Sequence, residues 1–204
     1  KFSTSTNIVR DSGRHINYIP TPNSKRVFNQ IENDFQKGIH SFNLIGSYGT
    51  GKSSFLWAFE KSVRGNQFFE SEILGKRDFE IWKFVGKYGS LIDTLASHFG
   101  IESNNPDSLI SEIYSQYHGF ASESKGLIII IDEFGKFLEY ASKNNPEREL
   151  YFIQELAEFI NNPKNSSLLI TAVHQNFDAY SFGLNAAQRQ EWSKVKGRFK
   201  EITF

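Results

Sequence analysis

A glycine-rich octapeptide at residues 46–53, Gly-Ser-Tyr-Gly-Thr-Gly-Lys-Ser, constrains this chain more than any other segment. It matches the phosphate-binding pattern G-x-x-x-x-G-K-[S/T] at every fixed position. Residues 41–45 before it are short and largely apolar, as in a buried strand, and residues 54–63 after it have helical spacing. Strand, glycine loop and helix together are the context that this motif, the P-loop, requires.

The residue types of the loop are suited to binding a nucleoside triphosphate. Its glycines allow a tight turn in which backbone N–H groups approach phosphate oxygens. The following helix directs the positive end of its dipole to the same place. Lys52 is expected to bind the β- and γ-phosphates, and the Ser53 hydroxyl to ligate Mg²⁺.

A second motif supplies the acidic groups that hydrolysis needs. Residues 127–131 are continuously apolar, as in a fully buried parallel strand, and Asp132 and Glu133 follow directly. We expect Asp132 to hold Mg²⁺ with Ser53, and Glu133 to activate the attacking water as general base. The alternative is an acidic helix start that only interacts favourably with the helix dipole.

Two further positions are candidates for catalysis. His174 is the first polar residue after the apolar run 168–173 and is expected to contact the γ-phosphate or the water, with Gln175 as the second choice. Arg198 precedes the last predicted strand and is expected to reach a nucleotide bound by a neighbouring subunit, with Arg189 as the second choice. Structural roles for these side chains remain open.

The segment that precedes the first helix carries candidate contacts to the base. Tyr18 and Pro20 are expected beside the adenine ring, although they could instead clamp the N-terminus onto the core. The full set of expected nucleotide contacts is Gly46, Ser47, Tyr48, Gly49, Thr50, Gly51, Lys52, Ser53, Ser54, Tyr18 and Pro20.

Composition restricts the class of protein. The 204 residues suffice for one domain with a sizeable core, and 39% of them are hydrophobic. Because Lys+Arg and Asp+Glu both number 23, the charge balance gives no support for strong nonspecific nucleic-acid binding. The absence of cysteine excludes disulfides and thiol nucleophiles. We expect a cytoplasmic protein without membrane contact and, since it lacks methionine, a trimmed or processed piece.

Apolar periodicity predicts alternating strands and helices. Strands are predicted at 42–46, 79–85, 127–131, 168–173 and 199–204. The first helix is predicted to begin at Ser24 as N-cap and to end at Gly38. This alternation favours an α/β three-layer sandwich with a mostly parallel, five-stranded sheet. We expect residues 1–40 to flank the nucleotide site and residues 41–204 to form the core.

Together these residues resemble the AAA+ superfamily of P-loop ATPases, including its origin-recognition and STAND-like branches. The resemblance implies the strand order 5-1-4-3-2, the sensor 1 position for His174, where Asn, Thr or Ser is usual, and an arginine finger for Arg198. It also implies a helical lid after the last strand, which we expect to be absent from this chain. Residues 132–139 are similar to large bacterial ATPases of mobile-element or phage-defence systems.

The resemblance implies ATP binding and Mg²⁺-dependent hydrolysis at a subunit interface, with conformational work on a larger protein assembly or homo-oligomer. Other functions stay open. They are a slowly hydrolysing nucleotide switch, a P-loop kinase and a DNA-handling motor. No segment distinguishes adenine from guanine, although an Asn-Lys-x-Asp string typical of GTPases is absent.

Overall fold

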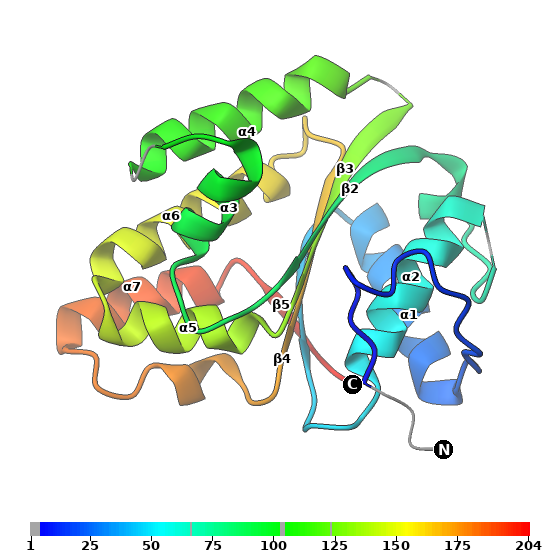
Figure 1. The fold of residues 1–204 in the computed structure, drawn as a ribbon, viewed down its shortest axis with the longest axis horizontal. Coiled ribbons are helices and arrows are strands. Elements are labelled where there is room, and N and C mark those ends of the chain that lie inside the picture. Colours follow the sequence, from blue (N-terminus) through cyan, green and yellow to red (C-terminus); the bar gives the residue numbers. More distant parts are fainter. Residues whose placement is uncertain (1–4, 66, 103–104, 123) are drawn as a thin grey trace.

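The computed structural model describes residues 5–65, 67–102, 105–122 and 124–204. Its strands form one five-stranded sheet (Figure 1). The strand order is β2-β3-β4-β1-β5, and every neighbouring pair is parallel. Read from the other edge, this is the predicted order 5-1-4-3-2, which is confirmed. The strands are β1 (Ser41–Ile45), β2 (Asp78–Val85), β3 (Lys125–Asp132), β4 (Ser167–Val173) and β5 (Lys200–Thr203).

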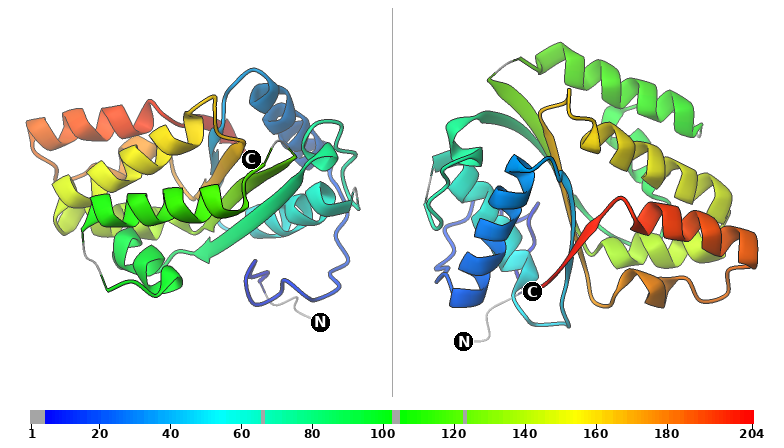
Figure 2. Two further views of the ribbon diagram at one scale, coloured as in Figure 1. Left: turned by 90° about the horizontal axis from the view of Figure 1, so that it is seen from above. Right: turned by 180° about the vertical axis from the view of Figure 1, so that it is seen from behind.

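Helices cover both faces of the sheet and complete the three predicted layers. In Figure 1, α1 and α2 lie on one side and α3 to α7 on the other, and Figure 2 shows the same layers from above and from behind. None of the helices in the described ranges is long and apolar enough to span a bilayer. The helices are α1 (Pro22–Gln36), α2 (Lys52–Gly65), α3 (Leu91–Phe99), α4 (Pro106–Phe120), α5 (Phe134–Lys143), α6 (Pro146–Asn161) and α7 (Ala186–Lys196), with single 3₁₀ turns at Leu74–Lys76 and Phe177–Tyr180.

Strand β3 explains why the sequence shows an unbroken apolar run. Ile128 and Ile130 belong to the core that packs under α1 and α2, whereas Ile129 and Ile131 belong to the core under α3 to α7. All four side chains are fully buried. Because successive strand residues point to opposite faces, a strand covered on both faces must be apolar at every position.

The start of α1 differs from the prediction. Thr21, not Ser24, is the N-cap residue, and its hydroxyl accepts the backbone N–H of Ser24 at 3.1 Å. The Ser24 hydroxyl in turn accepts the N–H of Thr21 at 2.8 Å, which completes a capping box. Pro22 occupies the first helical turn, where its missing N–H costs no hydrogen bond. The spacing Thr-x-x-Ser therefore contains two capping hydroxyls, and the prediction chose the wrong one.

The sheet order places three functional segments side by side. The P-loop follows β1, Asp132 ends β3, and His174 follows β4, which lies between β1 and β3. Because all strands run the same way, these three ends meet at the carboxyl edge of the sheet. Ligands of open parallel sheets bind at this edge.

Gly126, near the start of β3, offers a test of the sheet packing. A side chain there would overlap the Ser166 carbonyl oxygen and lie 2.9 Å from Phe79 Cε1. We expect Gly126→Ala to lower the free energy of unfolding by about 1–3 kcal/mol, measured by urea denaturation. The control is Gly119→Ala in α4, where nothing lies within 4 Å of the added Cβ. Equal stability of the two variants would contradict the packing of β3 against residue 166.

Candidate functional site

The P-loop backbone requires its glycines for two different reasons. Gly49 and Gly51 have φ angles of 78° and 93°, in the left-handed region that side chains disfavour. At Gly46 the reason is space, because an added Cβ would lie 3.0 Å from Thr50 Oγ1 and 3.3 Å from the Phe204 carbonyl oxygen. The loop is thus a compact turn that leads from β1 directly into α2.

Lys52 lies inside this turn. Its side-chain Nζ donates to the carbonyl oxygens of Gly46 and of Ser47, the latter at 2.9 Å. The residue is buried, and burial lowers the pKa of its ammonium group, while the nearby Asp132 and Glu133 carboxylates oppose that shift. The loop therefore holds one cation at its centre, bound by two carbonyl groups that a phosphate could replace.

Asp132 and Ser53, the predicted metal pair, interact with each other. The Ser53 side chain lowers the pKa of the Asp132 carboxyl, and Asp132 Oδ1 accepts the Glu133 N–H at 2.9 Å. Burial raises the pKa of Asp132, and both interactions act against that rise. A hydroxyl and a carboxylate oxygen side by side suit Mg²⁺, which completes its shell with phosphate and water oxygens. The described residues contain no group of three or more His, Cys, Asp or Glu that could hold a metal alone.

Glu133 adopts an uncommon backbone conformation. Its φ of 53° and ψ of 33° are left-handed, and among the described non-glycine residues it shares a positive φ with Asn145. Gly86 at the end of β2 permits this turn, since any side chain at 86 would overlap the Glu133 carbonyl group. Gly86 also donates its N–H to the Asp132 carbonyl oxygen at 2.7 Å. Strained residues held by their surroundings cluster at functional sites.

His174 joins the acidic pair to the P-loop. Its Nε2 lies 2.8 Å from Glu133 Oε2, and its Nδ1 lies 3.4 Å from Lys52 Nζ. The ring also stacks on Tyr48 of the P-loop, with ring centroids 3.4 Å apart. Gln175, the second choice for this position, does not line the cavity at the P-loop. The structure therefore brings His174 into the cluster.

Tyr180 was missed by the sequence analysis. It lies in the 3₁₀ turn after β4, is buried, and its hydroxyl accepts the backbone N–H of His174 at 3.3 Å. Burial raises the pKa of this phenol. A side chain at Gly135 would overlap the Tyr180 hydroxyl. Tyr180 thus links the end of β4 to the first turn of α5, which carries Glu133 at its start.

Glu133, His174 and much of the P-loop line one cavity of about 310 Å³, whereas Asp132 and Tyr180 are buried and are not among its lining residues. Two of its residues, Ser5 and Thr6, belong to the N-terminal segment and were not predicted. A larger cavity of about 590 Å³, between α1 and residues 68–73, contains none of the predicted site residues and lies apart from the chemistry. The lining of the smaller cavity is Ser5, Thr6, Tyr48, Gly49, Gly51, Lys52, Ser53, Ser54, Glu133 and His174.

Tyr18 and Pro20 do not line this cavity. The Tyr18 ring packs edge-on against Phe68 and Phe69, with centroids 5.5 and 6.0 Å away, and its burial raises the pKa of the phenol. This contact is the one expected of a clamp between the N-terminal segment and the core. The adenine-side role of these two residues stays a prediction.

The arginine candidates also lie outside the cavity. Arg198 donates to the Glu158 carboxylate and, at 2.9 Å, to the Lys194 carbonyl oxygen. Arg189 is exposed on α7. A finger that acts on a neighbouring subunit need not reach its own nucleotide, so the arginine-finger role stays a prediction.

Comparisons with known proteins support the fold. No family model and no curated protein matches the chain. Among solved structures, the ORC2 protein of Aeropyrum pernix, determined with ADPNP and ADP, is 13% identical with a TM-score of 0.58, and the match covers 93% of this chain and 50% of that one. Drosophila ORC bound to DNA is 15% identical with a TM-score of 0.52, covering 95% and 51%.

Caenorhabditis elegans PCH-2 is also similar, at 13% identity and a TM-score of 0.50, covering 91% of this chain and 43% of that one. This chain therefore spans about half or less of each of these three chains. At such identities the likeness shows the fold alone, an α/β sandwich around a parallel five-stranded sheet.

Proposed function

We propose that this chain is an AAA+-type module that binds ATP with Mg²⁺, hydrolyses it, and drives conformational change in a larger assembly. One observation carries the proposal. A single cavity is lined by the glycine loop with Lys52 and Ser53 and by the Glu133 carboxylate, and Ser53 interacts with the adjacent buried carboxylate of Asp132. Phosphoryl transfer to water requires these three groups together.

The P-loop binds and orients the triphosphate. Backbone N–H groups of the turn and the start of α2 face the phosphates, and Lys52 exchanges its two carbonyl partners for β- and γ-phosphate oxygens. Ser53 and Asp132 would hold Mg²⁺, which would neutralise part of the negative charge of the phosphates when bound. The stabilisation is electrostatic and is greatest where charge develops in the transition state.

Glu133 acts on the water. Its carboxylate accepts a proton as the water oxygen attacks the γ-phosphorus, the bond to the β–γ bridging oxygen breaks, and ADP leaves with phosphate formed. His174 lies within hydrogen-bond reach of both Glu133 and Lys52, so its ring can orient the base and contact the γ-phosphate. Arg198 serves a neighbouring subunit's nucleotide after releasing Glu158.

A second function has one observation in its favour. The His174 ring lies 2.8 Å from one oxygen of the Glu133 carboxylate, so a water molecule can use only the other oxygen without competing with the ring. This arrangement suits a nucleotide-dependent switch that hydrolyses ATP slowly and controls assembly by its bound state. For both the enzyme and the switch, the macromolecule on which the protein acts stays a prediction. The resemblance to phage-defence ATPases also stays a prediction.

Glu133→Gln tests the general base. We expect ATP turnover, measured as phosphate release, to fall by about 10²- to 10⁴-fold because the amide cannot accept the proton. ATP affinity should stay within about twofold, because glutamine keeps the size and shape of the side chain. The control, Glu139→Gln, removes an exposed charge from the same helix, α5, and should leave turnover unchanged. Equal turnover of wild type and Glu133→Gln would favour the switch.

Ser53→Ala tests the metal pair. The variant lacks the hydroxyl that contacts Asp132, so we expect the Mg²⁺ concentration for half-maximal turnover to rise by about 10- to 100-fold. Titration of Mg²⁺ at fixed ATP measures this value. An unchanged Mg²⁺ requirement would remove Ser53 from the metal site.

Tyr180→Phe tests whether the Tyr180 hydroxyl positions His174. The N–H of His174 loses its acceptor, which should lower the free energy of unfolding by about 1–3 kcal/mol. We expect kcat to fall about tenfold or more through misplacement of His174, with little change in KM. Tyr114→Phe on α4, away from the cavity, is the matched control. A variant that loses stability but keeps kcat would show that Tyr180 has only a structural role.

A further inference from the structure

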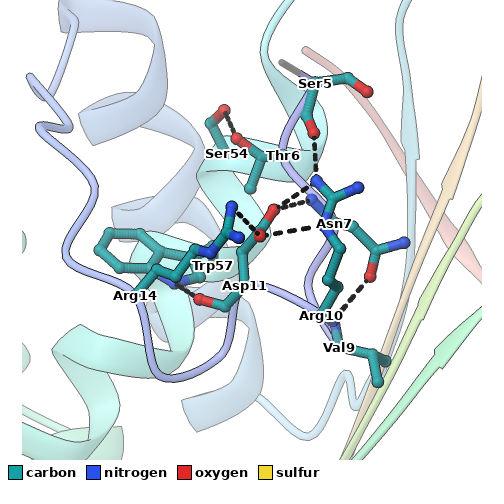
Figure 3. Close-up of polar contacts among 9 residues, drawn as sticks. All are labelled: Ser5, Thr6, Asn7, Val9, Arg10, Asp11, Arg14, Ser54 and Trp57. Atoms are coloured by element: carbon teal, nitrogen blue, oxygen red, sulfur yellow. Dashed lines mark hydrogen bonds and ion pairs between the residues drawn. The ribbon is translucent and has the colours of Figure 1, made fainter. Parts of the chain in front are cut away.

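Residues 5–14 form a turn on the outer side of α2, which we call the N-terminal hook (Figure 3). A buried carboxylate closes it. Asp11 accepts the Asn7 N–H at 2.9 Å and Arg10 Nε at 3.0 Å, and it forms an ion pair with Arg14 at 3.2 Å. The hydrogen bond from Arg10 is the main reason that the pKa of Asp11 falls to about 2. The hook is therefore closed by one carboxylate that pairs with two arginine side chains.

The hook is also fixed to α2. Trp57 Nε1 donates to the Asp11 carbonyl oxygen at 3.1 Å, and Lys61 Nζ donates to the Ser12 carbonyl oxygen at 2.8 Å. Ile8 is 1% exposed and packs in the core that α1 and α2 share. Moving the hook would expose this side chain and break hydrogen bonds to two residues of the helix that begins at the P-loop.

Because the hook is fixed to α2, its first residues lie against the P-loop cavity. Ser5 and Thr6, the start of the hook, are part of its lining, and Thr6 Oγ1 lies 2.9 Å from Ser54 Oγ (Figure 3). The hydrogen bonds that hold the hook against α2 come from other residues, namely Asp11 and Ser12. The hydroxyl groups of Thr6 and Ser54 therefore have no part in fixing the hook through those bonds.

The position of the pair indicates which part of a nucleotide it faces. Lys52, Glu133 and His174 gather where the γ-phosphate would lie. Ser54 follows the metal-binding hydroxyl of Ser53 along α2, and P-loops place the α- and β-phosphates over the backbone of the turn and the helix start. The hydroxyls of Thr6 and Ser54 are therefore on the side of the α-phosphate and ribose.

We infer that the N-terminal hook is a wall of the nucleotide site and that Thr6, together with Ser54, hydrogen-bonds to oxygen atoms at the α-phosphate and ribose end. The inference rests on the proposed function, because it assigns a further contact to the same nucleotide. ATP and ADP share these oxygens, so the contact contributes to the binding of both. It does not act on the γ-phosphate.

Thr6→Val tests the contact, since valine keeps the shape of threonine and lacks its hydroxyl. We expect the Kd values for ATP and for ADP, measured by calorimetry with the whole chain, to rise together by about 2- to 10-fold. Thr6→Ser should restore wild-type affinity. The matched control is the reciprocal change Val9→Thr, on a hook residue that is half exposed and does not line the cavity.

Repeating the Thr6→Val comparison with 2′,3′-dideoxy-ATP separates the two acceptors. A loss of affinity that persists assigns the contact to the α-phosphate, and one that disappears assigns it to the ribose. In the wild type, ATP should also slow tryptic cleavage after Arg10, because a bound nucleotide favours the docked hook.

The outcomes separate the two proposals. If Lys52→Ala abolishes nucleotide binding but Thr6→Val binds ATP and ADP like the wild type, the hook inference fails and the proposed function stands. If the wild type itself shows no Lys52-dependent binding, both fail. A loss confined to ATP would also overturn the inference, since it would place Thr6 at the γ-phosphate.

Discussion

The interaction between Ser53 and Asp132 links the P-loop to the end of β3, and the order of the strands brings these two residues together. The two residues belong to segments that follow β1 and end β3, with β4 between them. Parallel pairing of these strands brings the segments to one edge, while the apolar faces of β3 bury the strand from both sides. Glycines at 46 and 86 then allow the close approaches that the turns need.

Local patterns in the sequence were sufficient for the P-loop, for the buried strand ending in Asp132 and for most element positions. The strand order followed from family resemblance and is confirmed. Contacts between distant residues could not be read in this way. Thr6 meets Ser54 across 48 positions, and nothing in the composition of either segment signals it. The sequence does not distinguish Tyr180 from an ordinary core aromatic, whereas the structure shows that its hydroxyl accepts the backbone N–H of His174.

His174 departs from the pattern of the superfamily that the sequence resembles, and the structure shows what the imidazole contacts instead. Unlike the usual short polar side chain, the imidazole has two nitrogen atoms on opposite sides of a ring. One lies near Glu133 and the other near Lys52, and the ring face stacks on Tyr48. The same side chain therefore contacts Glu133, Lys52 and Tyr48, and both the enzyme and the switch interpretations depend on these contacts.

The close fit of Tyr180 against Gly135 has an evolutionary consequence. The phenol reaches the backbone of β4 only because residue 135 lacks a side chain, and Glu133 keeps its left-handed turn only beside Gly86. In divergent relatives, positions 135 and 180 should therefore covary: a larger residue at 135 would accompany a shorter one at 180. Position 86 should tolerate substitution only where residue 133 returns to an ordinary backbone conformation.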